Sequence, residues 1–194
     1  MAYLSSDNAM DEPTDAPIQL DGKLLIADPS LRDSIFNKSV ILMAEHENDE
    51  GAHGIILNTP TGQTVGDLLK DEMFAPLKNL PVHVGGPVGQ EHLHFAAFWL
   101  GDNQELRYVT RISAKDAITY TQQSGTLVRA FAGYSGWDAG QLEDELRKNS
   151  WITAQPTSTL LSSTHEKSLW RKLLREISPF HKILAEAPDD IFLN

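Results

Sequence analysis

An α+β fold is predicted from the order in which strand-forming and helix-forming segments follow one another along the 194 residues. Short apolar runs typical of strands arrive in groups. They lie at residues 24–27, 39–46, 52–58, 80–89, 93–99 and 106–110. Helical segments separate only some of these runs, which argues against the regular strand–helix alternation of a parallel α/β sheet. No repeat and no linker between folded units is visible, so residues 19–194 are expected to form a single domain.

The charge and cysteine content exclude several classes of protein. Asp and Glu (27) outnumber Lys and Arg (16), which gives a net charge of −11. Such a field repels phosphate backbones, so direct nucleic-acid binding is not expected. The absence of cysteine excludes disulfides, thiolate metal sites and cysteine nucleophiles. No secretory signal pattern and no apolar run of about 18 residues is present, so we expect a cytoplasmic protein without membrane contact.

The first 18 residues differ in composition from the rest. They contain four acidic residues, two prolines and no basic side chain. Too little apolar surface is available there to offset the entropy of ordering, so a disordered acidic tail is predicted.

The elements of the first half follow from local signals. Leu24–Ala27 is a buried strand that Asp28-Pro29 ends, and a short helical turn follows. The runs at 39–46 and 52–58 form an antiparallel hairpin around an acidic, glycine-containing turn, and Thr59-Pro60 ends it. A helix follows, with Thr64 as its N-cap and Asp67 in its first turn.

The second half is predicted in the same way. The run 80–89 is a short strand that ends in the glycine-rich turn GGPVG, and strands follow at 93–99, 106–110, 127–133 and 151–154. Helices are predicted from capping residues. These are Ser113 with Asp116, Asp138 with Gln141, and Ser163 with Glu166, the last helix ending at Ser178-Pro179.

Four blocks carry a resemblance to a known family. The first lies in Lys23–Pro60 and contains LLIA-x-P, SVILMAEH, GA-x-G and N-x-P. The second is GGPV at 85–88, the third is GY-x-GW-x-x-GQLE-x-E at 133–145 followed by a tryptophan, and the fourth is the late Trp170. In this order they resemble the AlgH/YqgE family of small bacterial proteins.

The resemblance implies a bifurcated, mostly antiparallel sheet that is partly closed as a small barrel and surrounded by helices. It implies no settled biochemical function, although the label of transcriptional regulator accompanies the AlgH name. The net charge argues against a regulator that contacts DNA directly. His92 has no counterpart in the family pattern.

Glu45 and His46, facing His53 across the hairpin, form the most prominent polar cluster. As a functional pair, the carboxylate would orient the imidazole for acid–base work or ligand binding. In the alternative, His46 caps the loop and Glu45 is solvated. Because neighbouring strand residues point to opposite faces, both enter one pocket only if the strand ends there.

We expect the hairpin and the glycine-rich bend to border a common hollow that takes a small ligand or a peptide. The binding residues of this hypothesis are Glu45, His46, Asn58, Pro60, Gly85, Gly86 and Pro87.

Three other motifs have simpler structural explanations. His92 and His94 could begin a metal site with His83 or His46, but exposed strand histidines are the commoner outcome and no metal is predicted. The GGPVG segment could hold an anion, although a tight turn with positive φ is favoured. Tyr134-Ser135 lacks the spacing of a nucleophile elbow.

A basic stripe lies on the last predicted helix, and a solvated helix face is favoured over a nucleic-acid surface. It consists of Lys167, Arg171, Lys172 and Arg175.

Together these observations predict a non-catalytic cytoplasmic protein, without a cofactor, that binds an unidentified small ligand or protein partner and has a possible regulatory role. The alternative is a small enzyme that uses Glu45, His46 and Asp33 for hydrolytic or acid–base chemistry.

Overall fold

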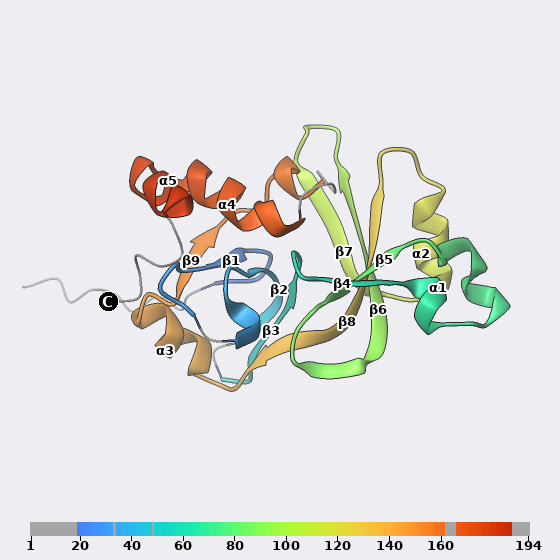
Figure 1. The fold of residues 1–194 in the computed structure, drawn as a ribbon, viewed down its shortest axis with the longest axis horizontal. Helices are drawn as coiled ribbons and strands as arrows, with labels where there is room; N and C mark the ends of the chain where they lie inside the picture. The colour runs from blue at the N-terminus through green and yellow to red at the C-terminus, as the bar shows by residue number, and fades with distance from the viewer. Residues whose placement is uncertain (1–18, 33, 48, 162–165, 188–194) are drawn as a thin grey trace, which may run out of the picture.

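The computed structural model describes residues 19–32, 34–47, 49–161 and 166–187 (Figure 1). The strands in this part of the chain are β1 (Leu24–Ala27), β2 (Val40–Glu47), β3 (Gly51–Ile56), β4 (Pro60–Thr64), β5 (Pro81–Val84), β6 (Val88–Leu100), β7 (Leu106–Ile112), β8 (Leu127–Trp137) and β9 (Trp151–Ala154). The α-helices are α1 (Val65–Leu68), α2 (Ala114–Thr121), α3 (Gln141–Arg147), α4 (Glu166–Ile177) and α5 (Pro179–Glu186), and the 3-10 helices are η1 (Ser34–Phe36), η2 (Glu72–Leu77) and η3 (Ser158–Leu161).

The sheet divides along β8, which belongs to two curled layers. Its last residues pair with β3, and from there the order runs β3-β2-β1-β9. Its earlier residues lie between β5 and β6, and these strands lead on to β4 and β7. Every strand pair is antiparallel except β5 with β8. The predicted bifurcated, mostly antiparallel α+β fold is confirmed.

Gly85 lies where the two layers separate. Its carbonyl accepts a hydrogen bond from the Ile56 amide at 2.8 Å, and its own amide donates to Ala132 at 2.8 Å. A Cβ atom on Gly85 would lie 2.2 Å from the Gly133 carbonyl oxygen, and one on Gly86 would lie 2.0 Å from the Tyr134 backbone. The double glycine is therefore required because the bend lies directly on the backbone of β8.

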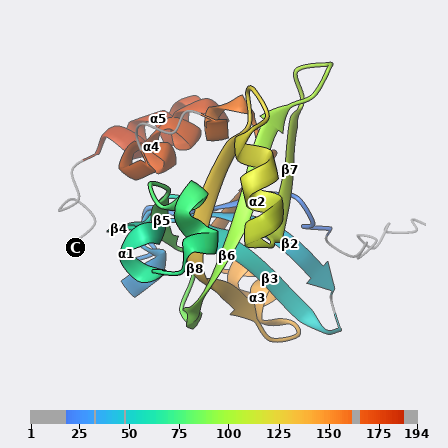
Figure 2. The same ribbon diagram turned by 90° about the vertical axis from the view of Figure 1, so that its right-hand side faces the viewer.

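Helices cover the sheet on several sides. Helices α4 and α5 lie together over one face of the β1–β9 side, and α3 lies on its other face (Figure 1). Trp170 fixes α4 to the sheet because its indole N–H donates to the Ala27 carbonyl at 2.7 Å. Helices α1 and α2 lie at the opposite end of the molecule in Figure 1, the end that faces the viewer in Figure 2. No described helix is long and apolar enough to cross a membrane.

Local signals predicted most of these elements correctly. The β2–β3 hairpin forms, and Thr64 with Asp67 and Ser113 with Asp116 cap their helices as expected. The break predicted after Ser178 is confirmed, because α5 begins at Pro179 with Ser178 as N-cap. The predicted tail at 1–18 and the cap at Ser163 lie outside the described residues.

Five features differ from the expectations. Pro60 does not only end the hairpin but begins β4, which lies at the edge of the sheet, where a missing amide costs no ladder hydrogen bond. Strand β6 begins at Val88, and β8 continues through Gly133 to Trp137 without a turn. Helix α3 begins after Gly140 instead of Asp138, and α5 was not foreseen.

Candidate functional site

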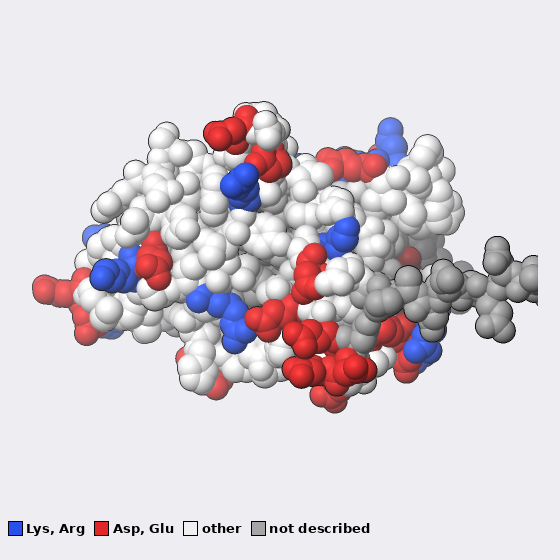
Figure 3. Space-filling view, turned by 180° about the vertical axis from the view of Figure 1, so that it is seen from behind, with Lys and Arg blue, Asp and Glu red and all other residues white. Residues whose placement is uncertain are grey.

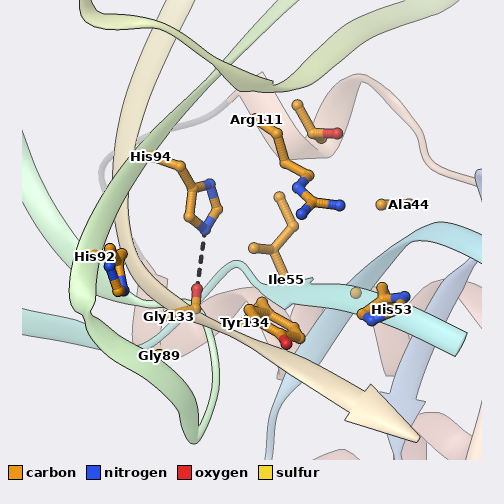
Figure 4. A pocket seen from close by; sticks show the side chains of 11 residues that line it. Ala44, His53, Ile55, Gly89, His92, His94, Arg111, Gly133 and Tyr134 are labelled. Atoms are coloured by element: carbon orange, nitrogen blue, oxygen red, sulfur yellow. Dashed lines mark hydrogen bonds between the residues drawn. The ribbon is translucent and has the colours of Figure 1, made fainter.

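A cavity of about 270 Å³ opens where the two layers separate, and we call it the fork cleft (Figure 4). Strand β3 forms one wall and β6 with β8 forms the other, while β7 reaches it from above. It is lined by Ala44, His53, Gly54, Ile55, Gly89, His92, His94, Thr110, Arg111, Gly133 and Tyr134.

A β-bulge in β2 decides which side chains face this cleft. Met43 pairs with Gly54 and Glu45 pairs with His53, so Ala44 is an extra residue in the ladder. An extra residue reverses the alternation of side chains along the strand. As a result, Glu45 reaches the rim of the cleft, where it lies 3.8 Å from both His53 and Arg111.

His46 faces the opposite side of the sheet. Its side chain is buried there, and its Nε2 atom lies 2.7 Å from the Glu143 carboxylate of α3. The His46 amide also donates to Asp21 at 2.8 Å. Glu45 and His46 therefore do not share a pocket, as the alternation of strand residues predicted.

Arg111 enters the cleft from a second bulge. Phe95 pairs with Ile112 and Ala97 pairs with Val109, so two residues of β7, Thr110 and Arg111, lie opposite one residue of β6. Arg111 takes φ of 56°, in the left-handed region, although it is not glycine. This conformation costs an L-residue about 1–2 kcal/mol. It directs the guanidinium into the space between His94 and His53 (Figure 4).

His94 is fixed by the backbone of β8. Its Nε2 atom donates to the Gly133 carbonyl at 2.9 Å, and its ring stacks on Phe131. Its Nδ1 atom is buried and has no hydrogen-bond partner in the described part of the chain. Burial lowers the pKa of His94 from its usual 6.5; the bond to Gly133 opposes this, and the Arg111 charge adds to it. His94 is therefore a neutral ring with a free acceptor atom.

The remaining polar groups of the cleft are more exposed. His53 is about half exposed and packs against the Tyr134 ring at 5.4 Å. His92 is largely exposed and lies 3.0 Å from Glu91. Across the described residues, no group of three His, Cys, Asp or Glu side chains could hold a metal ion. The cleft thus offers one permanent cation, imidazoles and an apolar wall.

The seven residues proposed from the sequence lie around the fork and not on the cleft wall. Asn58 accepts from the Val40 amide and donates to the Lys38 carbonyl, both at 2.8 Å, and so fixes the start of β2. Pro60 pairs with His83 in β4 and β5. Gly85 and Gly86 pack on β8, and Pro87 is exposed. Their assignment as binding residues stays a prediction, and Asp33 lies outside the described residues.

Sequence reasoning missed Arg111 and Tyr134 as cleft residues. Arg111 reaches the cleft only because of a bulge, for which no local sequence signal exists. Tyr134 lies just beyond the strand predicted at 127–133, whereas in the structure it belongs to β8. The sequence draws attention to His92 and His94 only as possible metal ligands, and the structure places both side chains on the cleft.

The charged surface is uneven. Acidic side chains gather at the lower right of the face in Figure 3, on the side where α3 lies, with few basic side chains among them. On α4, Arg171 and Arg175 are exposed while Trp170 and Leu174 are buried on the inner side. Arg175 lies 3.5 Å from Glu186 of α5. This arrangement fits the solvated face of an amphipathic helix.

Comparison with known families gives a match over most of the chain. A family model described as AlgH-like matches residues 24–180. A UPF0301 protein of Cytophaga hutchinsonii is 36% identical over 194 aligned residues, which cover 89% of this chain and 98% of the relative. One from Streptomyces coelicolor is 35% identical and covers 90% of this chain and 95% of the relative.

Two solved structures are similar in fold. A protein from Corynebacterium diphtheriae superposes with a TM-score of 0.71 at 22% identity and covers 87% of this chain and 92% of that one. The AlgH protein from Pseudomonas aeruginosa superposes with a TM-score of 0.58 at 26% identity, covering 91% of this chain and 99% of that one.

Proposed function

The chain belongs to the AlgH-like family, and we propose that it is a non-catalytic cytoplasmic binding protein that holds a small organic molecule in the fork cleft. In this proposal, residues 19–194 act as one domain. The two layers of the sheet supply the walls, and the residues that face the cavity decide what binds.

One observation carries the proposal. Arg111 is held in a costly backbone conformation inside a strand, and its side chain is directed to a largely apolar cavity. The other three described residues with positive φ and a side chain are Lys38, Gln104 and Asn149, and they lie outside strands and helices. Strained residues within regular structure gather at ligand sites, because the surrounding fold can maintain them there.

The arrangement of polar groups supports binding more than catalysis. A general base needs hydrogen-bond contact with a nucleophile or with substrate. His94 directs its Nε2 hydrogen to a backbone carbonyl, and His46 is joined to Glu143 on the far face of the sheet. The enzyme alternative requires Glu45 and His46 to act together, and they point in opposite directions.

Direct DNA binding has little support. The acidic surface repels the phosphate backbone, and the exposed basic residues of α4 are few. If duplex DNA were retained in filter binding at low salt, and Arg171→Glu abolished the retention, this part of the proposal would be wrong.

The proposal is tested with a thermal-shift screen of metabolites on the full chain. A ligand that binds only the folded state raises the melting temperature, by an amount that grows with the ratio of its concentration to its Kd. Thr110→Trp places a large ring in the cleft and serves as the blocked variant. Thr119→Trp, on the exposed side of α2, is the matched control. We expect stabilisers that act on wild type and on Thr119→Trp but not on Thr110→Trp.

Two outcomes contradict the proposal. In the first, no compound stabilises wild type. In the second, each stabiliser acts equally on Thr110→Trp, which places its binding site elsewhere.

A further inference from the structure

Glu45 interacts only weakly with Arg111 and His53 of the fork cleft. Its Oε1 atom lies 3.8 Å from Arg111 Nη1, and its Oε2 atom lies 3.8 Å from His53 Nδ1. Both distances exceed the 2.7–3.2 Å of a hydrogen bond. The Glu45 side chain is 63% exposed, so water screens these contacts. Glu45 can therefore leave its position at little cost.

Arg111 has unused capacity to bind an anion. A guanidinium carries five N–H donors in a planar fork that matches the two oxygens of a carboxylate. Among the described residues, Glu45 is the one carboxylate within 4.0 Å of Arg111. Its approach at 3.8 Å does not use those donors in the bidentate geometry.

The charges in the cleft fit a ligand with one negative charge. Arg111 is always protonated, whereas His94 is held neutral by its buried position. The Glu45 carboxylate at the rim and the net charge of −11 both oppose a second negative charge on the ligand. Ile55, Ala44 and the Tyr134 ring supply an apolar surface for the rest of the molecule.

We propose that the fork cleft selects apolar molecules that carry a single carboxylate, and that this carboxylate binds Arg111 and His53 by displacing Glu45. Glu45 is thus an internal competitor that occupies the anion position of the empty cleft. This inference rests on the proposed function, because it names the ligand class of the same cavity. Removal of the Glu45 charge is therefore expected to strengthen ligand binding.

The test uses acid and amide pairs of equal shape, phenylacetate with phenylacetamide and hexanoate with hexanamide, titrated into the full chain and followed by NMR. In wild type, each acid is expected to bind about tenfold more tightly than its amide, the worth of one charge-assisted bidentate contact. Arg111→Gln removes this preference. Arg107→Gln, which removes an exposed arginine of the same strand that pairs with Glu105, preserves it.

The Glu45→Gln variant tests whether Glu45 competes with the ligand for Arg111 or instead contacts the ligand. We expect this variant to bind the acids several-fold more tightly, because the neutral amide no longer competes for Arg111, and to leave the affinity of the amides unchanged. Weaker binding of the acids by Glu45→Gln contradicts the competitor role. Tighter binding of phenyl phosphate than of phenylacetate contradicts the preference for one negative charge.

Failure of this inference can be told apart from failure of the proposed function. If acids and amides bind equally and Thr110→Trp abolishes both, the cleft is a binding site without carboxylate preference, and only the inference is wrong. If acids bind tightly to Thr110→Trp, the carboxylate is recognised outside the cleft. If neither member of either pair binds and no screened compound stabilises the chain, both are wrong.

Discussion

Arg111 adopts an unfavourable backbone conformation, and this conformation places its charged side chain in the fork cleft. Its φ of 56° lies in a region that glycine adopts freely and other residues avoid, yet the side chain is the permanent cation of the fork cleft. Glycine at this position would remove the strain together with the charge. The bulge in β7 displaces Arg111 so that its side chain reaches between His94 and His53.

Replacing Arg111 by alanine and by glycine measures this strain. Both changes delete the same charged side chain, but only alanine retains the Cβ atom that clashes in the left-handed conformation. We expect Arg111→Gly to be about 1 kcal/mol more stable than Arg111→Ala, as measured by urea unfolding. At Arg107, in the regular part of β7, the order should be reversed, because glycine weakens an ordinary strand. Equal stability of the two Arg111 variants indicates an unstrained position.

His94 makes stability depend on pH with a defined sign. Its pKa is lowered in the folded state by burial and by Arg111. The other titratable groups that line the cleft are His53, His92 and Tyr134, and Glu45 lies at its rim. The unfolded chain therefore binds more protons than the folded chain just below pH 6.5, and stability is lost as pH falls through that range. Relative to His94→Gln, wild type should lose free energy of unfolding between pH 7.5 and pH 5.5.

The same shift can be observed directly. The His94 ring protons should titrate in NMR with a midpoint below the usual histidine pKa of 6.5. A free-energy difference from His94→Gln that does not vary with pH contradicts the effect.

Helix α3 explains the spacing of the polar and tryptophan residues between Trp137 and Trp151. Glu145 accepts from two indoles, Trp137 at 2.9 Å and Trp151 at 2.7 Å, and from the Gln141 side chain at 3.0 Å. Gln141 in turn accepts from the Asp138 amide at 3.1 Å. One carboxylate thus joins the end of β8, the start of β9 and the helix between them. The spacing of these residues along the chain is set by this contact and not by a ligand.

Removing the Glu145 carboxylate is expected to destabilise the fold. Glu145→Ala leaves two largely buried indole N–H groups without their acceptor, which should cost about 2–3 kcal/mol of unfolding free energy. Asp144→Ala, which removes the exposed neighbouring carboxylate, should cost less than about 0.5 kcal/mol. Unfolding followed by tryptophan fluorescence reports on both indoles. A loss of similar size in both variants means that the network does not hold the three elements together.

The elements that could be predicted are those whose cause is local. Ser113 caps its helix because its hydroxyl accepts from the Asp116 amide, and at Thr64 the Asp67 carboxylate accepts from the Thr64 amide and hydroxyl. The β2–β3 hairpin likewise follows from two apolar runs around a polar turn. Strand β4 could not be predicted, because its polar residues form a strand only by pairing with β5. The cleft depends on the bulges at Ala44 and Arg111. Each bulge arises from the way its strand pairs with the neighbouring strand, so it leaves no signal in the local sequence.

The whole molecule is organised by the point at which its two layers separate. There β8 changes neighbours, from β5 to β3, and Gly85 bonds to both sides. The fork cleft exists because the layers diverge there, so its shape depends on residues that do not line it. In the proposed function, the glycine-rich bend sets the angle between the walls, whereas Arg111 and His53 contact the ligand.

Gly85→Ala tests whether close approach at the fork holds the two layers in place. The new Cβ atom would lie 2.2 Å from the Gly133 carbonyl oxygen, which belongs to the backbone and cannot rotate away. We expect a loss of about 3 kcal/mol or more in the free energy of unfolding. Gly125→Ala is the matched control, because Gly125 has φ of 79° with open space around it, so it reports backbone strain alone, about 1–2 kcal/mol.

The two variants should also differ in binding. Gly85→Ala keeps every side chain of the fork cleft, yet it must separate β8 from the bend and so change the spacing between Ile55 and His94. Phenylacetate binding should therefore weaken in Gly85→Ala and be unaffected in Gly125→Ala. If Gly85→Ala is as stable as Gly125→Ala and binds as wild type does, the layers tolerate displacement at the fork, and the cleft is shaped by its lining residues alone.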